Sequence, residues 1–217
     1  MQRLSPRQGG FVNPFSLSLV WNTRDDVLRP TRGWRAILKG THTNRQLLSD
    51  YQFTRLDADL AYLYPLVASG RHVLGVRVNG GLLAGPKRAV PFWELDDLGG
   101  DDTLRGFFPH RFLGNERILF NAEYRFPIWG FDFFHYWYVD VGGLLFSSVG
   151  RVFMSVNELK QGFGLDQAAA THLTQTPQYD YGLGLRFAVA KAILARVDVG
   201  FSEENTGLVY LSFGHTF

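Results

Sequence analysis

Large apolar residues alternate with polar or small residues in stretch after stretch of this chain, and this period of two limits what it can fold into. In residues 193–203, for example, Val197 and Val199 alternate with Arg196 and Asp198. Such alternation predicts β-strands that have one apolar face. No stretch shows a convincing helical period, so the expected fold class is all-β with antiparallel strands. The nine alternating stretches are residues 14–22, 33–41, 51–63, 72–83, 116–128, 131–145, 179–189, 193–203 and 208–217.

Composition agrees with a chain of strands and narrows the possible partners. Aromatic residues make up 15% of the 217 residues, and there are 24 glycines and no cysteine, which excludes disulfides, thiolate metal sites and cysteine nucleophiles. The 22 basic and 20 acidic residues are spread along the chain, so nucleic acid is not an expected partner. The mean hydropathy of −0.07 fits membrane strands. About ten residues suffice for one such strand, and because apolar and polar residues alternate in it, their hydropathy averages to near zero.

The links between the expected strands alternate in length. A barrel of the outer-membrane type has short turns at one end and long loops at the other. The expected short links are residues 23–32, 64–71, 127–131 and 190–192, and the longer ones are residues 42–50, 84–115 and 146–178. A tight link at residues 204–207 is the exception.

The face opposite the apolar residues carries most of the charge in the expected strands. In a membrane barrel this face lines the lumen, whereas in a soluble β-sandwich the same face meets water. Alternation alone leaves both readings open. Aromatic residues near the strand ends favour the membrane, where they form interfacial girdles; they are Trp21, Trp34, Phe126, Trp129, Phe131, Phe133, Phe213 and Phe217.

No catalytic or cofactor motif stands out in the sequence. The six histidines are scattered, and no HExxH, GxSxG or phosphate-binding loop occurs. The acidic pairs Asp25–Asp26 and Asp101–Asp102 are explained most simply as solvated turn and loop residues. We therefore expect a protein that is not an enzyme and has neither a metal site nor a cofactor.

Several segments, in their order along the chain, carry a resemblance to one family. Together they resemble the superfamily that includes BamA, TamA, the two-partner secretion transporters and the bacterial surface antigen proteins. A DTRD-like and PTRG-like hairpin comes first, and a GG…RGF loop motif follows it. The segments are Trp21–Asp25, Pro30–Gly33, Leu98–Phe107, Glu123–Pro127, Tyr138–Gly142, Gly182–Arg186, Arg196–Asp198 and the terminal Phe217.

This resemblance implies a register for the strands. In the family the RGF loop joins the eleventh and twelfth strands of a sixteen-strand barrel, so the nine strands here correspond to the eighth to the sixteenth. Residues 1–217 are then the C-terminal portion of an outer-membrane β-barrel domain, and residues 84–115 are its long extracellular loop. Earlier strands, POTRA domains and a signal peptide are not among these residues, and the first 15 residues lack a signal-peptide pattern.

The loop motif Leu104, Arg105, Gly106 and Phe107 supplies the candidate site. A loop of about 30 residues is long enough to fold back into a lumen, and an arginine buried there needs carboxylate partners. We expect these partners to be Glu123 and Asp140 on the two following strands, as the resemblance also implies. The alternative is a solvated loop arginine. Phe213 and Phe217 resemble the C-terminal β-signal of outer-membrane proteins.

The function that the resemblance implies is assembly and insertion, or translocation, of outer-membrane proteins in the bacterial outer membrane. Its partners are then membrane lipid, unfolded outer-membrane proteins and accessory lipoproteins, and self-association is one way to complete the barrel. Two alternatives stay open. The barrel could anchor another activity, such as a patatin-like phospholipase domain, or the chain could be a soluble β-sandwich binding module.

Overall fold

The computed structural model describes residues 10–217 except for residues 28, 86–89, 134–136, 155–175 and 190–192. Its elements are eleven strands and two short 3-10 helices, η1 (Arg45–Leu47) and η2 (Phe92–Glu94). Among the described residues, no helix is long and apolar enough to cross a membrane. The strands are β1 (Phe15–Asn22), β2 (Gly33–Thr43), β3 (Phe53–Pro65), β4 (Val73–Ala84), β5 (Asp96–Leu98), β6 (Phe112–Gly114), β7 (Glu116–Phe133), β8 (Trp137–Phe153), β9 (Gln178–Val189), β10 (Ile193–Ser202) and β11 (Leu208–Phe213).

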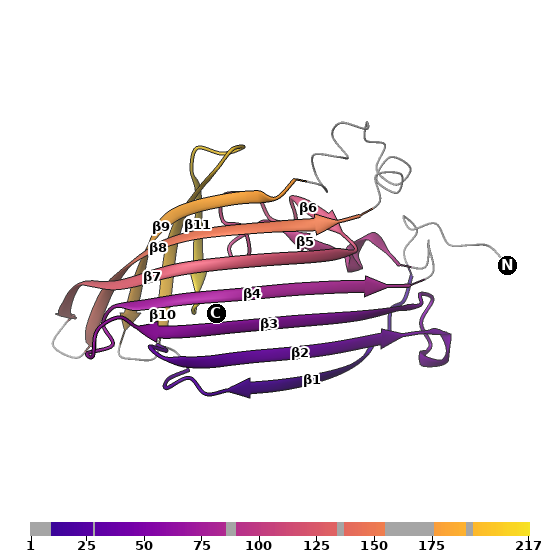
Figure 1. The fold of residues 1–217 in the computed structure, drawn as a ribbon, viewed down its shortest axis with the longest axis horizontal. Coiled ribbons are helices and arrows are strands. Elements are labelled where there is room, and N and C mark those ends of the chain that lie inside the picture. The colour runs from indigo at the N-terminus through magenta and orange to yellow at the C-terminus, as the bar shows by residue number, and fades with distance from the viewer. Residues whose placement is uncertain (1–9, 28, 86–89, 134–136, 155–175, 190–192) are drawn as a thin grey trace.

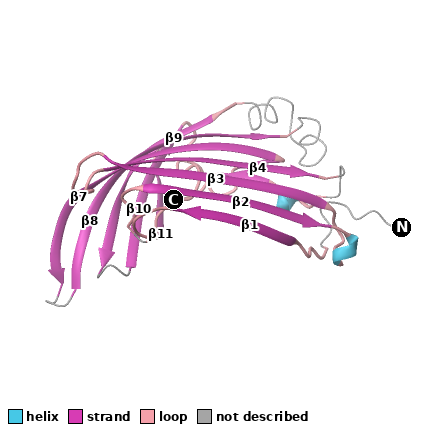
Figure 2. Cartoon of the chain, turned by 60° about the horizontal axis from the view of Figure 1, so that its bottom comes forward, coloured by secondary structure: helices cyan, strands magenta, loops and turns pink. Residues whose placement is uncertain are grey.

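Nine of these strands form one continuous antiparallel sheet in the order β1-β2-β3-β4-β7-β8-β9-β10-β11. Figures 1 and 2 show that the sheet curls strongly, so that β10 and β11 lie behind the strands that face the viewer. Within the described residues β1 and β11 each have one sheet neighbour, so the sheet is open. The all-β barrel prediction is therefore confirmed as a partial barrel wall. The sandwich alternative is wrong, because one curved sheet takes the place of two packed sheets.

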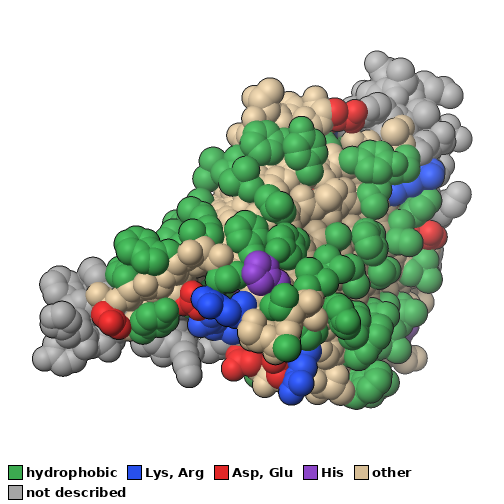
Figure 3. Space-filling view, turned by 60° about the vertical axis from the view of Figure 1, so that its left-hand side comes forward, with side chains coloured by type: hydrophobic (Ala, Val, Ile, Leu, Met, Phe, Trp, Pro, Cys, Tyr) green, Lys and Arg blue, Asp and Glu red, His purple; other side chains and the backbone are tan. Residues whose placement is uncertain are grey.

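The apolar face of the sheet points outward, which the sequence pattern could not decide. On β9, Leu183 is 50% exposed, while its neighbours on the opposite face, such as Arg186 and Asp180, are buried. Hydrophobic side chains cover much of the outer surface in Figure 3. Because an apolar face turned toward water would be unfavourable, this arrangement fits a wall whose outer side meets lipid.

Strands β7 and β8 are longer than their sequence pattern indicates. The predicted short link at residues 127–131 is wrong, since β7 continues to Phe133 with a register shift between Pro127 and Trp129. A proline is tolerated there because β4 begins at Val73, opposite Arg125, so β7 has no neighbour on that side beyond Arg125. The extra residue keeps Trp129 and Phe131 on the same face as Phe126, and this change of parity hid the strand from a simple alternation count. The long link predicted at residues 146–178 likewise begins later, because β8 extends to Phe153.

The outward face predicts how charge substitutions change stability. Leu183 lies midway along β9 and Tyr179 lies near its loop end, both exposed on the same face. In lipid vesicles Leu183→Arg should lower the free energy of unfolding by about 2–4 kcal/mol, and Tyr179→Arg by about 0–1 kcal/mol, because the cost of a charge depends on depth in the bilayer. Denaturant titration measures both. Equal and small effects of the two substitutions would show that this face does not contact lipid.

Candidate functional site

The loop between β4 and β7 folds against the inner face of the sheet and carries its own short hairpin. Within it, β5 pairs with β6, Leu98 lying opposite Phe112. Two apolar clusters hold the loop on the wall. Loop residues Val90 and Leu95 pack against Tyr51, Phe53 and Leu83. The other cluster is formed by Leu98, Leu104, Phe107 and Phe112 of the loop with Leu119 of β7 and Val152 of β8.

A tight turn at Gly99 and Gly100 presents the RGF motif to the wall. Both glycines have a positive φ, of 117° and 102°, which residues other than glycine rarely adopt. The amide of Gly100 donates to the carbonyl of Leu104 at 3.1 Å, and the amide of Gly99 donates to Oγ1 of Thr103 at 2.9 Å. Because Leu104 is fully buried, the turn fixes the direction in which Arg105 leaves the loop.

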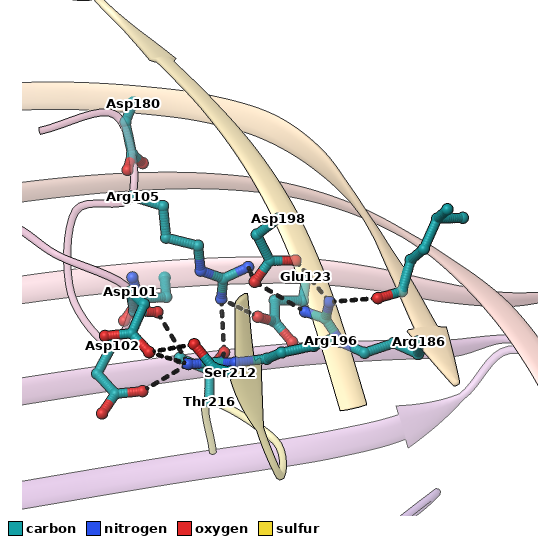
Figure 4. Close-up of polar contacts among 12 residues, drawn as sticks. Asp101, Asp102, Arg105, Glu123, Asp180, Arg186, Arg196, Asp198, Ser212 and Thr216 are labelled. Carbon is teal, nitrogen blue, oxygen red and sulfur yellow. Dashed lines mark hydrogen bonds and ion pairs between the residues drawn. The ribbon is translucent and has the colours of Figure 1, made fainter. Parts of the chain in front are cut away.

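Arg105 is fully buried, with 0% of its surface exposed, and it lies among charged side chains of the wall (Figure 4). Its guanidinium forms an ion pair with Glu123 of β7 and approaches Asp198 of β10 at 3.5 Å. It also donates to Oγ1 of Thr216 at 2.8 Å and lies 4.2 Å from the ring centre of Phe146. Burial alone would lower the pKa of Arg105, but the attraction of Glu123 and Asp198 raises it above its ordinary value. The arginine is therefore charged inside the lumen.

The two carboxylates that face Arg105 also bind arginines of the wall. Glu123 accepts hydrogen bonds from Arg125 through Oε2, at 3.0 Å from Nε and 2.7 Å from Nη2. Asp198 accepts from Arg186 at 2.5 and 3.3 Å. The result is a chain of alternating charge, in which the loop arginine is the central member. We name this chain the lumen ion chain; its members are Arg125, Glu123, Arg105, Asp198 and Arg186.

Backbone atoms of the motif also form hydrogen bonds with the wall. The amide of Gly106 donates to Asp180 of β9 at 2.9 Å, and its carbonyl accepts from Ser202 at 2.7 Å. A Cβ on Gly106 would lie 2.5 Å from the carbonyl oxygen of Phe201, so only glycine allows this approach to β10. Tyr210 of β11 donates to the carbonyl of Phe107 at 2.6 Å. The motif thus contacts each of the last three strands.

The acidic pair Asp101–Asp102 has a role that the sequence did not reveal. Arg196 of β10 donates to Asp101 at 2.8 Å and to Asp102 at 2.9 Å, and Ser212 of β11 donates to Asp101 at 2.5 Å. Partial burial would raise the pKa of Asp101, but the hydrogen bonds from Ser212 and Arg196 outweigh it and lower that pKa. The reading of Asp101 as a merely solvated residue is therefore wrong.

Asp140 does not pair with Arg105, which corrects one expected contact. It forms an ion pair with Arg29, from the link between β1 and β2. The register explains this, because Glu123 lies opposite Phe146 on β8. Asp140 is six residues away along that strand, about 20 Å at the usual rise per residue.

The side chain of Phe217 lies on the lumen side of the sheet and not on its apolar outer face. This corrects a second prediction, in which the alternation placed Phe217 on the apolar face. It is 1% exposed, whereas Phe213 is 75% exposed on the outside. The strand ends at Phe213, and Gly214, with a φ of 83°, turns the chain inward. The alternation extended to residue 217 was therefore wrong beyond Phe213. Whether the two phenylalanines act as an insertion signal stays a prediction.

Several residues of the site were not singled out by sequence reasoning. Asp198, Arg186 and Arg196 stood on the predicted polar face, so alternation placed them in the lumen without showing their partners. Asp180 and Thr216 stood on the same expected face, again with nothing to show their partners. In the part of the chain that the structure describes, no group of three or more metal-ligating side chains lies together.

Replacing Arg105 should release the loop. Arg105→Ala leaves Glu123 without its loop partner, and breaking a buried pair of this kind costs about 3–5 kcal/mol. We expect chymotrypsin to cleave the refolded variant after Phe107 much faster than the unaltered chain. Arg111→Ala is the matched control, because Arg111 lies in the same loop but pairs with Glu204 at the surface. A loop as resistant in Arg105→Ala as in the control would contradict the role assigned to Arg105.

Comparison with known proteins identifies the family. Residues 10–217 match the model of the Omp85 superfamily domain. The crystal structure of BamA from Haemophilus ducreyi lacking POTRA domains 1–3 is similar, with a TM-score of 0.71 at 16% identity. The match covers 92% of this chain but 41% of that chain, so this chain has the fold of part of such a barrel. Because the family model matches nearly the whole length of this chain, the chain belongs to the Omp85 superfamily.

Proposed function

We propose that this chain is the C-terminal portion of an outer-membrane barrel that assembles and inserts, or translocates, outer-membrane proteins. Family membership and the likeness to a BamA barrel support the proposal. In this proposal the outer membrane of a bacterial cell surrounds the apolar face, and residues 84–115 lie on the extracellular side. The partners are membrane lipid and unfolded outer-membrane proteins, together with accessory lipoproteins.

The observation that carries the proposal is the attachment of the RGF loop to β9, β10 and β11, the last three strands of the described sheet. The contacts come from both the backbone and the side chains of residues 101–107. The wall residues involved are Asp180, Arg196, Asp198, Ser202, Tyr210 and Ser212.

An open strand edge presents unpaired backbone groups, which can add a strand from another chain. For such an edge to serve as a template it must keep its shape while the added strand is still disordered. The buried RGF loop braces β9 to β11 from the inside, and burying its charges is costly unless they are paired. In this proposal the loop therefore keeps β9 to β11 in shape while a strand is added.

Reconstitution tests the proposal. The chain refolded into phospholipid vesicles should speed the folding of a separate small outer-membrane barrel protein, measured by its heat-modifiable gel migration. Arg105→Ala should bring the rate down to that of vesicles alone, while Arg111→Ala should keep the full rate. If the unaltered chain is folded in the vesicles and the substrate still folds no faster than in empty ones, the proposed function is wrong.

A further inference from the structure

The four residues after β11, Gly214–Phe217, enter the lumen and contact the site there. Gly214 makes this possible, because its φ of 83° is one that glycine adopts readily. Its amide donates to the carbonyl of Leu194 at 2.8 Å, which fixes the point where the chain leaves β11. Thr216 and Phe217 are both buried beyond this point.

The hydroxyl of Thr216 lies between two arginines (Figure 4). Oγ1 accepts a hydrogen bond from Nη2 of Arg105 at 2.8 Å and a second one from Nη1 of Arg196. A hydroxyl oxygen has two lone pairs and can accept both. Hydrogen bonds from charged donors are stronger than those between neutral groups, so this one oxygen ties the loop arginine to β10.

Phe217 contacts Arg125, which also forms an ion pair with Glu123. Its carbonyl oxygen accepts from Nη2 of Arg125 at 3.3 Å, and its ring centre lies 5.3 Å from the Arg125 guanidinium carbon. The ring also packs close to Gly75 of β4, where a Cβ would lie 3.0 Å away. The segment therefore bridges from β11 across the lumen to β4.

The arginines of the site have more donors than the wall can satisfy. Atoms without a hydrogen-bond partner include Nε and Nη1 of Arg105, Nη1 of Arg125, and Nε of both Arg186 and Arg196. Thr216 and Phe217 offer oxygen acceptors at this place. Withdrawing the segment would leave further buried donors unpaired, which is unfavourable.

From these contacts we infer that Gly214–Phe217 is a latch, in which Thr216 positions Arg105 and so couples the end of β11 to the RGF loop. Because the latch continues directly from β11, a displacement of that strand would withdraw Thr216 from Arg105 and loosen the loop. The holding of the loop is independent of any activity. Only its consequence for assembly, the release of the brace when the edge strand moves, rests on the proposed function.

His215 gives the latch a dependence on pH. Its ring nitrogen Nδ1 is buried without a hydrogen-bond partner. Burial lowers the pKa of His215 far below the ordinary value; the positive charges of Arg125, Arg186 and Arg196 act in the same direction, and Glu123 acts against it. In a released latch the histidine has its usual pKa of about 6.5. Protonation therefore favours the released state, and docking should weaken about tenfold per pH unit below about pH 6.5. His215→Gln should remove this dependence.

The test compares Thr216→Val with Thr41→Val in the refolded chain. Thr41 is also a buried threonine of the inner wall, and its hydroxyl bonds Ser16 at 3.0 Å, away from the loop. Thr216→Val should speed chymotrypsin cleavage of the RGF loop about tenfold, the equivalent of one lost hydrogen bond to a charged group. Thr41→Val should leave cleavage unchanged, and Thr216→Ser, which keeps the hydroxyl, should restore resistance.

A double-substitution comparison separates positioning from general loosening. If Thr216 acts through Arg105, Thr216→Val should add nothing to cleavage in an Arg105→Ala background. An additive effect there, or an unchanged loop in Thr216→Val alone, overturns the latch. A variant that fails to refold is recognised by loss of heat-modifiable migration, and Thr216→Ser then supplies the comparison. No substrate protein enters these measurements, so their failure is distinct from failure of the proposed function.

Discussion

A guanidinium taken out of water must find its charges and hydrogen bonds inside the protein, and Arg105 meets this requirement at the inner wall of the curved sheet. Glu123 and Asp198 supply the opposite charge, and Arg125 and Arg186 extend the lumen ion chain on either side. Removing any carboxylate would leave buried positive charge uncompensated, which is far more costly than a lost surface pair. These interactions hold the RGF motif in the lumen, together with the two apolar clusters and the backbone hydrogen bonds of Gly106 and Phe107.

The two faces of the sheet differ in how specific their side-chain contacts must be, and the lumen ion chain explains this difference. Outward residues such as Leu183 need only match an apolar surrounding, whereas inward residues must match particular partners across the lumen. Gly106 illustrates how narrow that match is, because any side chain there would collide with the backbone of β10. The loop therefore behaves as an inner layer of the wall, attached to the three strands nearest the open edge.

The sequence predicted the strands well because alternation records the environment of each face directly. It also predicted that Arg105 would meet Glu123, since the alternation put Glu123 on the polar face of the strand that follows the loop. The pairing of Asp140 could not be predicted, because it depends on how far the strands slide past one another. The bulge near Pro127 and the inward turn at Gly214 each changed which face the following residues point to. Counting alternate residues along the sequence cannot reveal such a change. Thr216 gave no signal, because a threonine near a strand end is ordinary until its neighbours are known.

Amide hydrogen exchange of the refolded chain tests the central claim most directly. If the RGF loop is fixed in the lumen, the amides of Gly100, Gly106 and Phe107, which donate to Leu104, Asp180 and Leu104 respectively, should exchange as slowly as those of β9 and β10. Protection by buried hydrogen bonds of this kind reports the free energy of local opening. Exchange of these amides at the rate of an unstructured peptide, with β9 and β10 protected, would contradict a loop anchored by Arg105.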